Sequence, residues 1–244
     1  MIAIIAPARL ASTRFPEKLL HEIKGKALIL WVAERLADQV PEIPRYFAVD
    51  HPRLQETLES AGFATVMTRS DHVCGTDRLA EANESIGADL IINVQGDEPL
   101  VTRGQIKALE ARLQNGSDMA TLATPFESWA DFLDPNQVKV VVDTEGRALY
   151  FSRSAIPYVR DREGDASQAT ISNFPAYRHL GLYGYSSGFL SAFCSLPKTI
   201  LEYTEKLEQL RALENGYSIH VDITDDPSIG VDTIEDAIAF ERFI

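Results

Sequence analysis

A loop rich in small polar and basic residues follows the first apolar segment of the chain. The run Ile2–Ala6 leads directly into Pro7–Lys18, which reads PARLASTRFPEK. Arginine and lysine pair with phosphate oxygens, and hydroxyl and backbone N–H groups can complete the binding of a phosphate. The sequence lacks G-x-G-x-x-G and G-x-x-x-x-G-K-[ST] here, so the alternatives are another kind of phosphate loop or a solvated basic turn. The candidate anion-binding residues are Arg9, Ser12, Thr13, Arg14 and Lys18.

Two acidic residues occur in contexts that suit a metal ion bound to phosphates. Asp97 follows Gly96 in the segment Asn93–Pro99, at the end of an apolar run, and the glycine allows the backbone to approach a ligand. Asp232 lies in Gly230–Asp236, where the cap of the last helix does not need it. Carboxylate oxygens are ligands that Mg²⁺ accepts alongside phosphate oxygens. An ordinary acidic turn is the alternative for Asp97.

Three further positions could serve either a substrate or the fold. Arg153 lies in the apolar segment Tyr150–Pro157, where it needs an anionic partner, either a substrate carboxylate or a structural salt bridge. His179 opens a strand-like run, and a lone histidine of this kind is more often structural than catalytic. Glu208 and Gln209 lie in a stretch that by itself indicates a helix with solvated charges.

The composition excludes several classes of protein. With 45% hydrophobic and 24% charged residues, the 244-residue chain is typical of a soluble globular domain. A formal net charge of −13 argues against a nucleic-acid surface but leaves room for a few cations in one pocket. No run approaches the roughly 20 apolar residues of a membrane span, and no signal peptide is expected. Cys74 and Cys194 form no CxxC pair, so we expect a cytoplasmic protein without disulfides, zinc or membrane insertion.

Strand and helix patterns alternate in the first half of the chain, which predicts an α/β fold with a parallel sheet. Helical spacing begins at Leu28, runs from Pro52 to Gly62, and follows a capping box at Thr102–Gln105. The basic loop and the first acidic segment therefore lie at the carboxyl ends of strands, where open α/β sheets bind ligands. The predicted buried strands are Ile2–Ala6, Tyr46–Val49, Ala64–Met67 and Asp89–Val94.

The pattern changes after about residue 126. We predict a single domain, residues 1–244, with an antiparallel insertion at about 126–190 that is a natural place for a dimer contact. A polar, mobile loop is expected over Arg160–Asn173, a helix from about Glu202 to Asn215, and a last helix capped by Thr233. The predicted strands of the insertion are Val138–Val142, Ala148–Phe151 and His179–Tyr185, with a turn at Asp143–Gly146.

Seven stretches, taken in order, span nearly the whole chain: Pro7–Lys18, Gly75–Glu81, Asn93–Pro99, Tyr150–Pro157, Arg178–Tyr185, Leu207–Arg211 and Gly230–Asp236. Together they resemble one family, the 3-deoxy-manno-octulosonate cytidylyltransferases, or CMP-Kdo synthetases. The resemblance implies a Rossmann-like nucleotide-diphosphosugar transferase fold with a mixed sheet and an antiparallel dimerisation insertion. It also implies a homodimer whose partners are CTP and a 3-deoxy-octulosonate sugar acid.

The same resemblance implies a role for each site residue. The implied reaction transfers CMP from CTP to the anomeric hydroxyl of the sugar acid, giving CMP-Kdo and pyrophosphate for lipopolysaccharide biosynthesis. Lys18, Asp97 and Asp232 would be catalytic, with Asp97 and Asp232 binding Mg²⁺. The residues implied to hold the nucleotide are Arg9, Ser12, Thr13, Lys18, Gly75 and Thr76, and those implied to surround the sugar are Gln95, Arg153, His179, Tyr183, Glu208 and Gln209.

Several positions depart from the family pattern. Glu17 stands where the family has a glycine, Val73 and Cys74 replace a Gln-Ser pair, Ser186 replaces an arginine, and Lys198–Glu202 replaces a Pro-Ser-Pro-Leu-Glu segment. These changes affect substrate recognition more than the metal centre. The 8-amino analogue of the sugar (Kdo8N), or another sugar acid, therefore remains an alternative acceptor.

Two other classes of protein fit the sequence less well. A catalytically inactive binding module on the same fold has no need to keep Lys18, Asp97 and Asp232 together. A nicotinamide oxidoreductase would carry the glycine fingerprint after the first strand, and it is absent.

Overall fold

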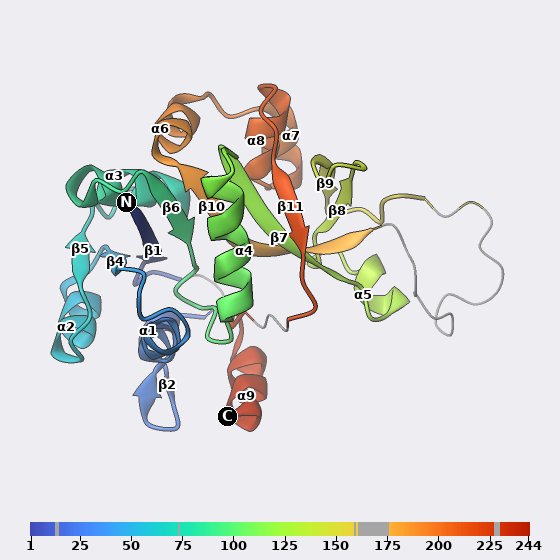
Figure 1. The fold of residues 1–244 in the computed structure, drawn as a ribbon. Coiled ribbons are helices and arrows are strands. Elements are labelled where there is room, and N and C mark those ends of the chain that lie inside the picture. Colours follow the sequence, from blue (N-terminus) through green and yellow to red (C-terminus); the bar gives the residue numbers. More distant parts are fainter. Residues whose placement is uncertain (13–14, 73, 159, 161–175, 227–229) are drawn as a thin grey trace.

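The computed structural model describes residues 1–12, 15–72, 74–158, 160, 176–226 and 230–244. Its centre is a mixed sheet with the strand order β11-β7-β10-β6-β1-β4-β5 (Figure 1). β10 runs antiparallel to β6 and β7, and the other neighbours in this order are parallel. The predicted mixed sheet of a Rossmann-like fold is thus confirmed. The strands are β1 (Ile2–Ala8), β4 (Arg45–Val49), β5 (Thr65–Met67), β6 (Leu90–Asn93), β7 (Met119–Pro125), β10 (Tyr177–Ser186) and β11 (His220–Ile223).

Helices cover both faces of this sheet because side chains of its central strand alternate between two apolar clusters. Ile4 and Ala6 of β1 pack in one cluster, and Ala3 and Ile5 pack in the other. A strand buried on both faces is apolar throughout, which is why Ile2–Ala6 shows no polar alternation. The first cluster includes residues of α1 (Leu28–Gln39), α2 (Pro52–Ser60), α4 (Arg103–Gln114) and α9 (Ile234–Phe243); the second includes α3 (Gly75–Ile86), α6 (Ser187–Ser195) and α8 (Gln209–Glu214).

Several helices begin and end where local chemistry predicts. The capping box before α4 is complete, since Thr102 N donates to Gln105 Oε1 at 3.0 Å and Gln105 N donates to Thr102 Oγ1 at 3.2 Å. Thr233 forms a second capping box with Asp236 at the start of α9. Gly62, beyond the end of α2, has a φ of +85°, which favours glycine.

The antiparallel part of the chain lies at one end of the sheet. The strands β8 (Lys139–Val142) and β9 (Ala148–Ser152) form the predicted hairpin, and β8 pairs with the start of β10. The helix α5 (Trp129–Leu133) packs beside them in a small cluster of its own. β10 also pairs with β7 along nearly its whole length and with β6 over its second half, so this strand belongs both to the main sheet and to the antiparallel region. The predicted mobile loop falls outside the described residues, apart from Arg160.

The single helix expected from Glu202 to Asn215 is wrong. The structure has two short helices, α7 (Ile200–Glu205) and α8 (Gln209–Glu214), because Lys206 adopts a left-handed conformation with a φ of +55°. Glu208 lies in the step between the two helices, where it lines two cavities. No helix in the described part of the chain is long and apolar enough to cross a membrane. The other short elements are η1 (Lys18–Leu20), β2 (Glu22–Ile23) and β3 (Lys26–Ala27).

A buried ion pair holds α7 against α8. Arg211 donates from Nη2 to Glu202 Oε1 at 2.5 Å and from Nε to Glu202 Oε2 at 2.7 Å, and both side chains are almost fully buried. The guanidinium also lies over the ring of Phe193, which links the pair to α6. Removing one partner of such a pair leaves the other charge buried and uncompensated.

We therefore expect Arg211→Met to lower the free energy of unfolding by about 3–5 kcal/mol, as measured by urea denaturation. The exposed Arg242 near the end of α9 provides the control, since Arg242→Met should change the same quantity by less than about 0.5 kcal/mol. Equal losses in the two variants would contradict this role for the Arg211–Glu202 pair.

Candidate active site

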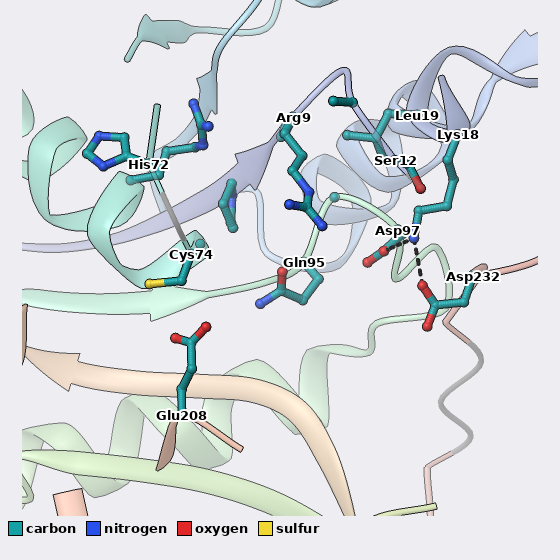
Figure 2. Close-up of a pocket in the computed structure, with 16 residues that line it drawn as sticks. Arg9, Ser12, Lys18, Leu19, His72, Cys74, Gln95, Asp97, Glu208 and Asp232 are labelled. Atoms are coloured by element: carbon teal, nitrogen blue, oxygen red, sulfur yellow. Dashed lines mark hydrogen bonds and ion pairs between the residues drawn. The ribbon is translucent and has the colours of Figure 1, made fainter. Parts of the chain in front are cut away.

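A cavity of about 290 Å³ lies at the carboxyl ends of the parallel strands (Figure 2). The loop after β1, the start of α3 and the loop after β6 form its walls, together with residues from the last part of the chain. The position agrees with the ligand sites of open α/β sheets. Thr13, Arg14 and Val73 lie outside the described residues. The polar residues that line the cavity include Arg9, Ser12, Lys18, His72, Arg78, Gln95, Asp97, Glu208 and Asp232.

Lys18 lies between two carboxylates at one end of this cavity. Its ammonium forms an ion pair with Asp97 and donates to Asp232 Oδ1 at 2.8 Å (Figure 2). Burial by itself would lower the pKa of Lys18, but the charges and hydrogen bonds of the two carboxylates outweigh it, and the pKa is raised above its usual value. Lys18 therefore carries a positive charge at neutral pH.

Backbone contacts bring these three residues together. Val231 N donates to Asp97 O at 2.9 Å, which fixes the segment before α9 beside the loop after β6. Gly230 lies so near that loop that an added Cβ would meet Glu98 Oε1 at 3.1 Å. The buried Leu19 anchors η1 in the core and thereby sets the position of Lys18.

The donor set suits a hard divalent cation bound to phosphates. Asp97 and Asp232 share one ammonium partner, so their carboxylates face the same point. No group of three or more His, Cys, Asp or Glu side chains that could hold a metal ion occurs among the described residues. A Mg²⁺ ion characteristically takes one or two protein carboxylates and completes its shell with phosphate oxygens and water. Two carboxylates beside a loop that carries Arg9, Ser12 and Lys18 fit this pattern.

Two glycines, Gly75 and Gly96, also line the cavity. Gly75 begins α3, whose first backbone N–H groups have no partner within the helix and can bind an anion or a polar ligand. Gly96 has no room for a side chain, since an added Cβ would meet Ile29 Cδ1 at 3.1 Å and Pro7 O at 3.2 Å. At Gly96 the backbone of the loop therefore lies close to the backbone of β1. Beside Gly75, burial raises the pKa of the Cys74 thiol to about 12, so the side chain is neutral and only weakly polar.

A second cavity of about 260 Å³ adjoins the first. Gly75, Gln95 and Glu208 line both cavities. Thr76 Oγ1 donates to Glu208 Oε2 at 3.0 Å, which links the start of α3 to the step between α7 and α8. The second cavity is also lined by Thr76, Asn93, Tyr183, Tyr185, Lys206 and Gln209, so two ligands could lie end to end with Gln95 and Glu208 between them.

Two of the sequence-predicted sugar-binding residues line neither cavity. Arg153 donates from Nε to Glu205 O at 2.8 Å and from Nη1 to Pro135 O at 3.1 Å, which ties the end of β9 to the end of α7 and to the loop after α5. His179 lies behind Tyr183, with 5.3 Å between the ring centroids, and its Nε2 is 3.0 Å from Thr121 Oγ1.

The positions that depart from the family pattern find partners nearby. Glu17, in a left-handed conformation with a φ of +51°, forms two hydrogen bonds with Arg53 of α2, so its charge is compensated on the protein surface. Ser186 caps α6 by accepting from Phe189 N, and it lines neither cavity.

Two residues that line the first cavity, His72 and Arg78, were not predicted from the sequence. His72 forms a hydrogen bond with Glu81, and Arg78 forms an ion pair with Asp50, directly after β4. Arg78 lies in the motif segment Gly75–Glu81, three residues after its glycine, and this position was a usable signal. Asp50 had a weaker signal, its place at the carboxyl end of a predicted strand.

Comparison with known proteins agrees with this geometry. The cytidylyltransferase family model matches residues 3–223. A 3-deoxy-manno-octulosonate cytidylyltransferase of Syntrophotalea carbinolica is 47% identical over 100% of this chain and 98% of its own length. The chain belongs to the 3-deoxy-manno-octulosonate cytidylyltransferase family. It is therefore an enzyme, a nucleotidyltransferase, and the oxidoreductase and inactive-module alternatives are set aside.

Other relatives and solved structures extend the similarity. The 3-deoxy-manno-octulosonate cytidylyltransferase of Geobacter sulfurreducens is 46% identical over 96% of both chains. A solved CMP:2-keto-3-deoxy-manno-octonic acid synthetase in complex with CTP superposes with a TM-score of 0.89, is 36% identical, and is matched over 99% of this chain and 97% of its own. A cytidylyltransferase of Leptospira borgpetersenii, 14% identical with a TM-score of 0.64, shares the fold over 98% of this chain and 84% of its own.

The environment of His179 determines the protonation state that we predict for its imidazole. Burial lowers the pKa of this imidazole to about 3. The single proton of the Thr121 hydroxyl points to Leu182 O, its nearer acceptor at 2.7 Å, so Thr121 Oγ1 accepts from an Nε2–H group of a neutral His179. We expect ¹⁵N chemical shifts to show this neutral tautomer throughout pH 5–8. A titration of His179 with a midpoint near 6.5, the ordinary value, would contradict this assignment.

Proposed function

We propose that the enzyme transfers CMP from CTP to the anomeric C2 hydroxyl of 3-deoxy-D-manno-octulosonate, giving CMP-Kdo and pyrophosphate. The observation that carries the proposal is Lys18 held between Asp97 and Asp232, at one end of a cavity that adjoins a second one. The names of the relatives supply the two substrates. They name the unmodified sugar, which favours it over the 8-amino analogue.

The two cavities suggest how the substrates are arranged. Arg9, Ser12 and Lys18 line the first cavity and would bind the triphosphate, with cytosine toward Gly75. The second cavity would hold the sugar acid against Tyr183 and Gln209. Gln95 and Glu208 line both cavities, so the reacting atoms would meet beside them.

The reaction forms one bond to phosphorus and breaks another. The C2 oxygen attacks the α-phosphorus of CTP, the bond from that phosphorus to the bridging oxygen breaks, pyrophosphate leaves, and the hydroxyl proton passes to solvent or to the departing phosphate. Negative phosphate oxygens repel the attacking oxygen, so Arg9 and Lys18 would lower the barrier by screening that charge. The rest of the cavity would align the two reactants.

We further propose that Asp97 and Asp232 bind Mg²⁺. The support is the convergence of both carboxylates on one cation, Lys18, beside the phosphate-binding loop. When bound, Mg²⁺ supplies charge screening at the phosphate oxygens and lowers the pKa of a hydroxyl that it binds.

The protein is expected to release pyrophosphate when it is given CTP, Mg²⁺ and 3-deoxy-D-manno-octulosonate, and to release none with CTP alone. Asp97→Asn should lower kcat by about 10³-fold at saturating Mg²⁺, because an amide cannot replace the charge of the carboxylate. Asp38→Asn, on the exposed side of α1, is the matched control and should turn over normally. If the unaltered protein released no pyrophosphate with this sugar or with its 8-amino analogue, the proposed function would be overturned. Normal turnover of Asp97→Asn would overturn the metal site.

We also propose that the enzyme is a homodimer. Large apolar side chains are exposed near the antiparallel region, among them Leu149 of β9 and Ile200 and Tyr203 of α7, which are 62%, 80% and 71% exposed. Ser152 of β9 donates to Glu205 at the end of α7, so the two elements adjoin. Sedimentation equilibrium should give twice the chain mass of 27.1 kDa, and Tyr203→Lys should shift the mass toward the monomer. A monomeric unaltered protein at micromolar concentration would contradict the dimer.

We propose that the reaction takes place in the cytoplasm. Cys74 and Cys194 are both unpaired thiols, which is typical of proteins in a reducing compartment.

A further inference from the structure

A carboxylate that lines neither cavity connects two walls of the nucleotide cavity. Asp50 follows β4, and its side chain is only 9% exposed. Its Oδ1 accepts from Leu10 N at 2.8 Å, within the basic loop after β1. Its Oδ2 accepts from Arg78 Nη2 at 3.1 Å, on α3. The two oxygens of one side chain thus hold one group on each wall.

The bond to Leu10 fixes the part of the loop that carries the anion-binding residues. Leu10 lies directly after Arg9 and two positions before Ser12, and both of these line the cavity. A loop outside regular structure has few backbone hydrogen bonds to hold its shape, so a buried carboxylate that accepts one of its N–H groups restricts it strongly. The direction of Arg9 therefore depends on Asp50.

The ion pair keeps Arg78 in one place. The Arg78 side chain is 4% exposed, and its Nη1 donates to Thr68 Oγ1 at 2.5 Å. Thr68 in turn donates to Val49 O at 2.9 Å, at the end of β4. Burial lowers the pKa of Arg78, the charge of Asp50 opposes this shift, and the nearby Arg9 adds to it. Without Asp50, Arg78 would lose the carboxylate of its ion pair while the like charge of Arg9 stayed nearby.

We infer that Asp50 is a positioning residue for the nucleotide: it holds the backbone beside Arg9 and the guanidinium of Arg78 in the arrangement that binds CTP. The inference rests on the proposed function, since it takes the first cavity as the CTP site. Asp50 touches neither cavity and acts through the two groups that it binds. Its effect is therefore expected in nucleotide binding, with little effect on the affinity for the sugar acid.

The test uses the full-length protein and measures the Kd for CTP by calorimetry in the absence of sugar, together with the KM for each substrate. Asp50→Ala removes both acceptors and should raise the Kd and the KM for CTP by about tenfold or more, while the KM for the sugar acid changes by less than about twofold. Asp50→Asn keeps an oxygen for Leu10 N and should lose less, about threefold to fivefold. Asp38→Asn is the control with unchanged constants.

A double variant separates positioning from simple folding damage. If Asp50 acts partly through Arg78, then Asp50→Asn added to Arg78→Met should weaken CTP binding less than the product of the two single effects. An unchanged Kd for CTP in Asp50→Ala would overturn the inference, and so would a loss of kcat and thermal stability with both KM values unchanged. Failure of the unaltered protein to bind CTP would instead overturn the proposed function.

Discussion

Lys18 places one buried positive charge between two carboxylates that come from the middle and the end of the chain. The ion pairs require the loop after β1, the loop after β6 and the segment before α9 to lie together. The hydrogen bond from Val231 N to Asp97 O fixes the last two segments beside each other. A buried ammonium without its carboxylates would be strongly unfavourable. In the proposed reaction the same three groups would serve the triphosphate, Lys18 as a cation and the two carboxylates as ligands of a metal ion. One electrostatic contact would then support both the fold and the proposed function.

The remaining architecture brings a second binding region to that contact. β10 enters the sheet against the direction of its neighbours and thereby presents Tyr183 next to the carboxyl end of β6. The left-handed Lys206 ends α7 early, so Glu208 reaches both cavities and accepts from Thr76. The Arg211–Glu202 ion pair joins α7 to α8 and thereby fixes the step between them. An antiparallel strand and a broken helix are thus the features that join the second cavity, proposed for the sugar acid, to the first, proposed for the nucleotide.

Residues that do not line the cavities also fix the geometry of the site. Asp50 connects the loop after β1 with α3, and Arg53 compensates the charge that Glu17 adds to the same loop. Asp50 directly follows β4, and Arg53 lies in the first turn of α2. Side chains that touch a ligand keep their direction only when such partners fix their own backbone. Glu17 thus has its own partner, Arg53, while Lys18 pairs with Asp97 and Asp232.

The sequence by itself determined the local and the periodic features of this protein. Alternating apolar strands and amphipathic helices specify an α/β sheet because their hydrophobic periods differ, and the capping box at Thr102 needs only neighbouring residues. The basic loop and the ordered motifs also identified the family, and several of the residues that they carry line the two cavities. Only the tertiary structure decided that Asp97 and Asp232 meet, that Arg153 turns to backbone carbonyls, and that the helix breaks at Lys206. These outcomes depend on packing between segments far apart in the chain, and sequence spacing carries no information about such distances.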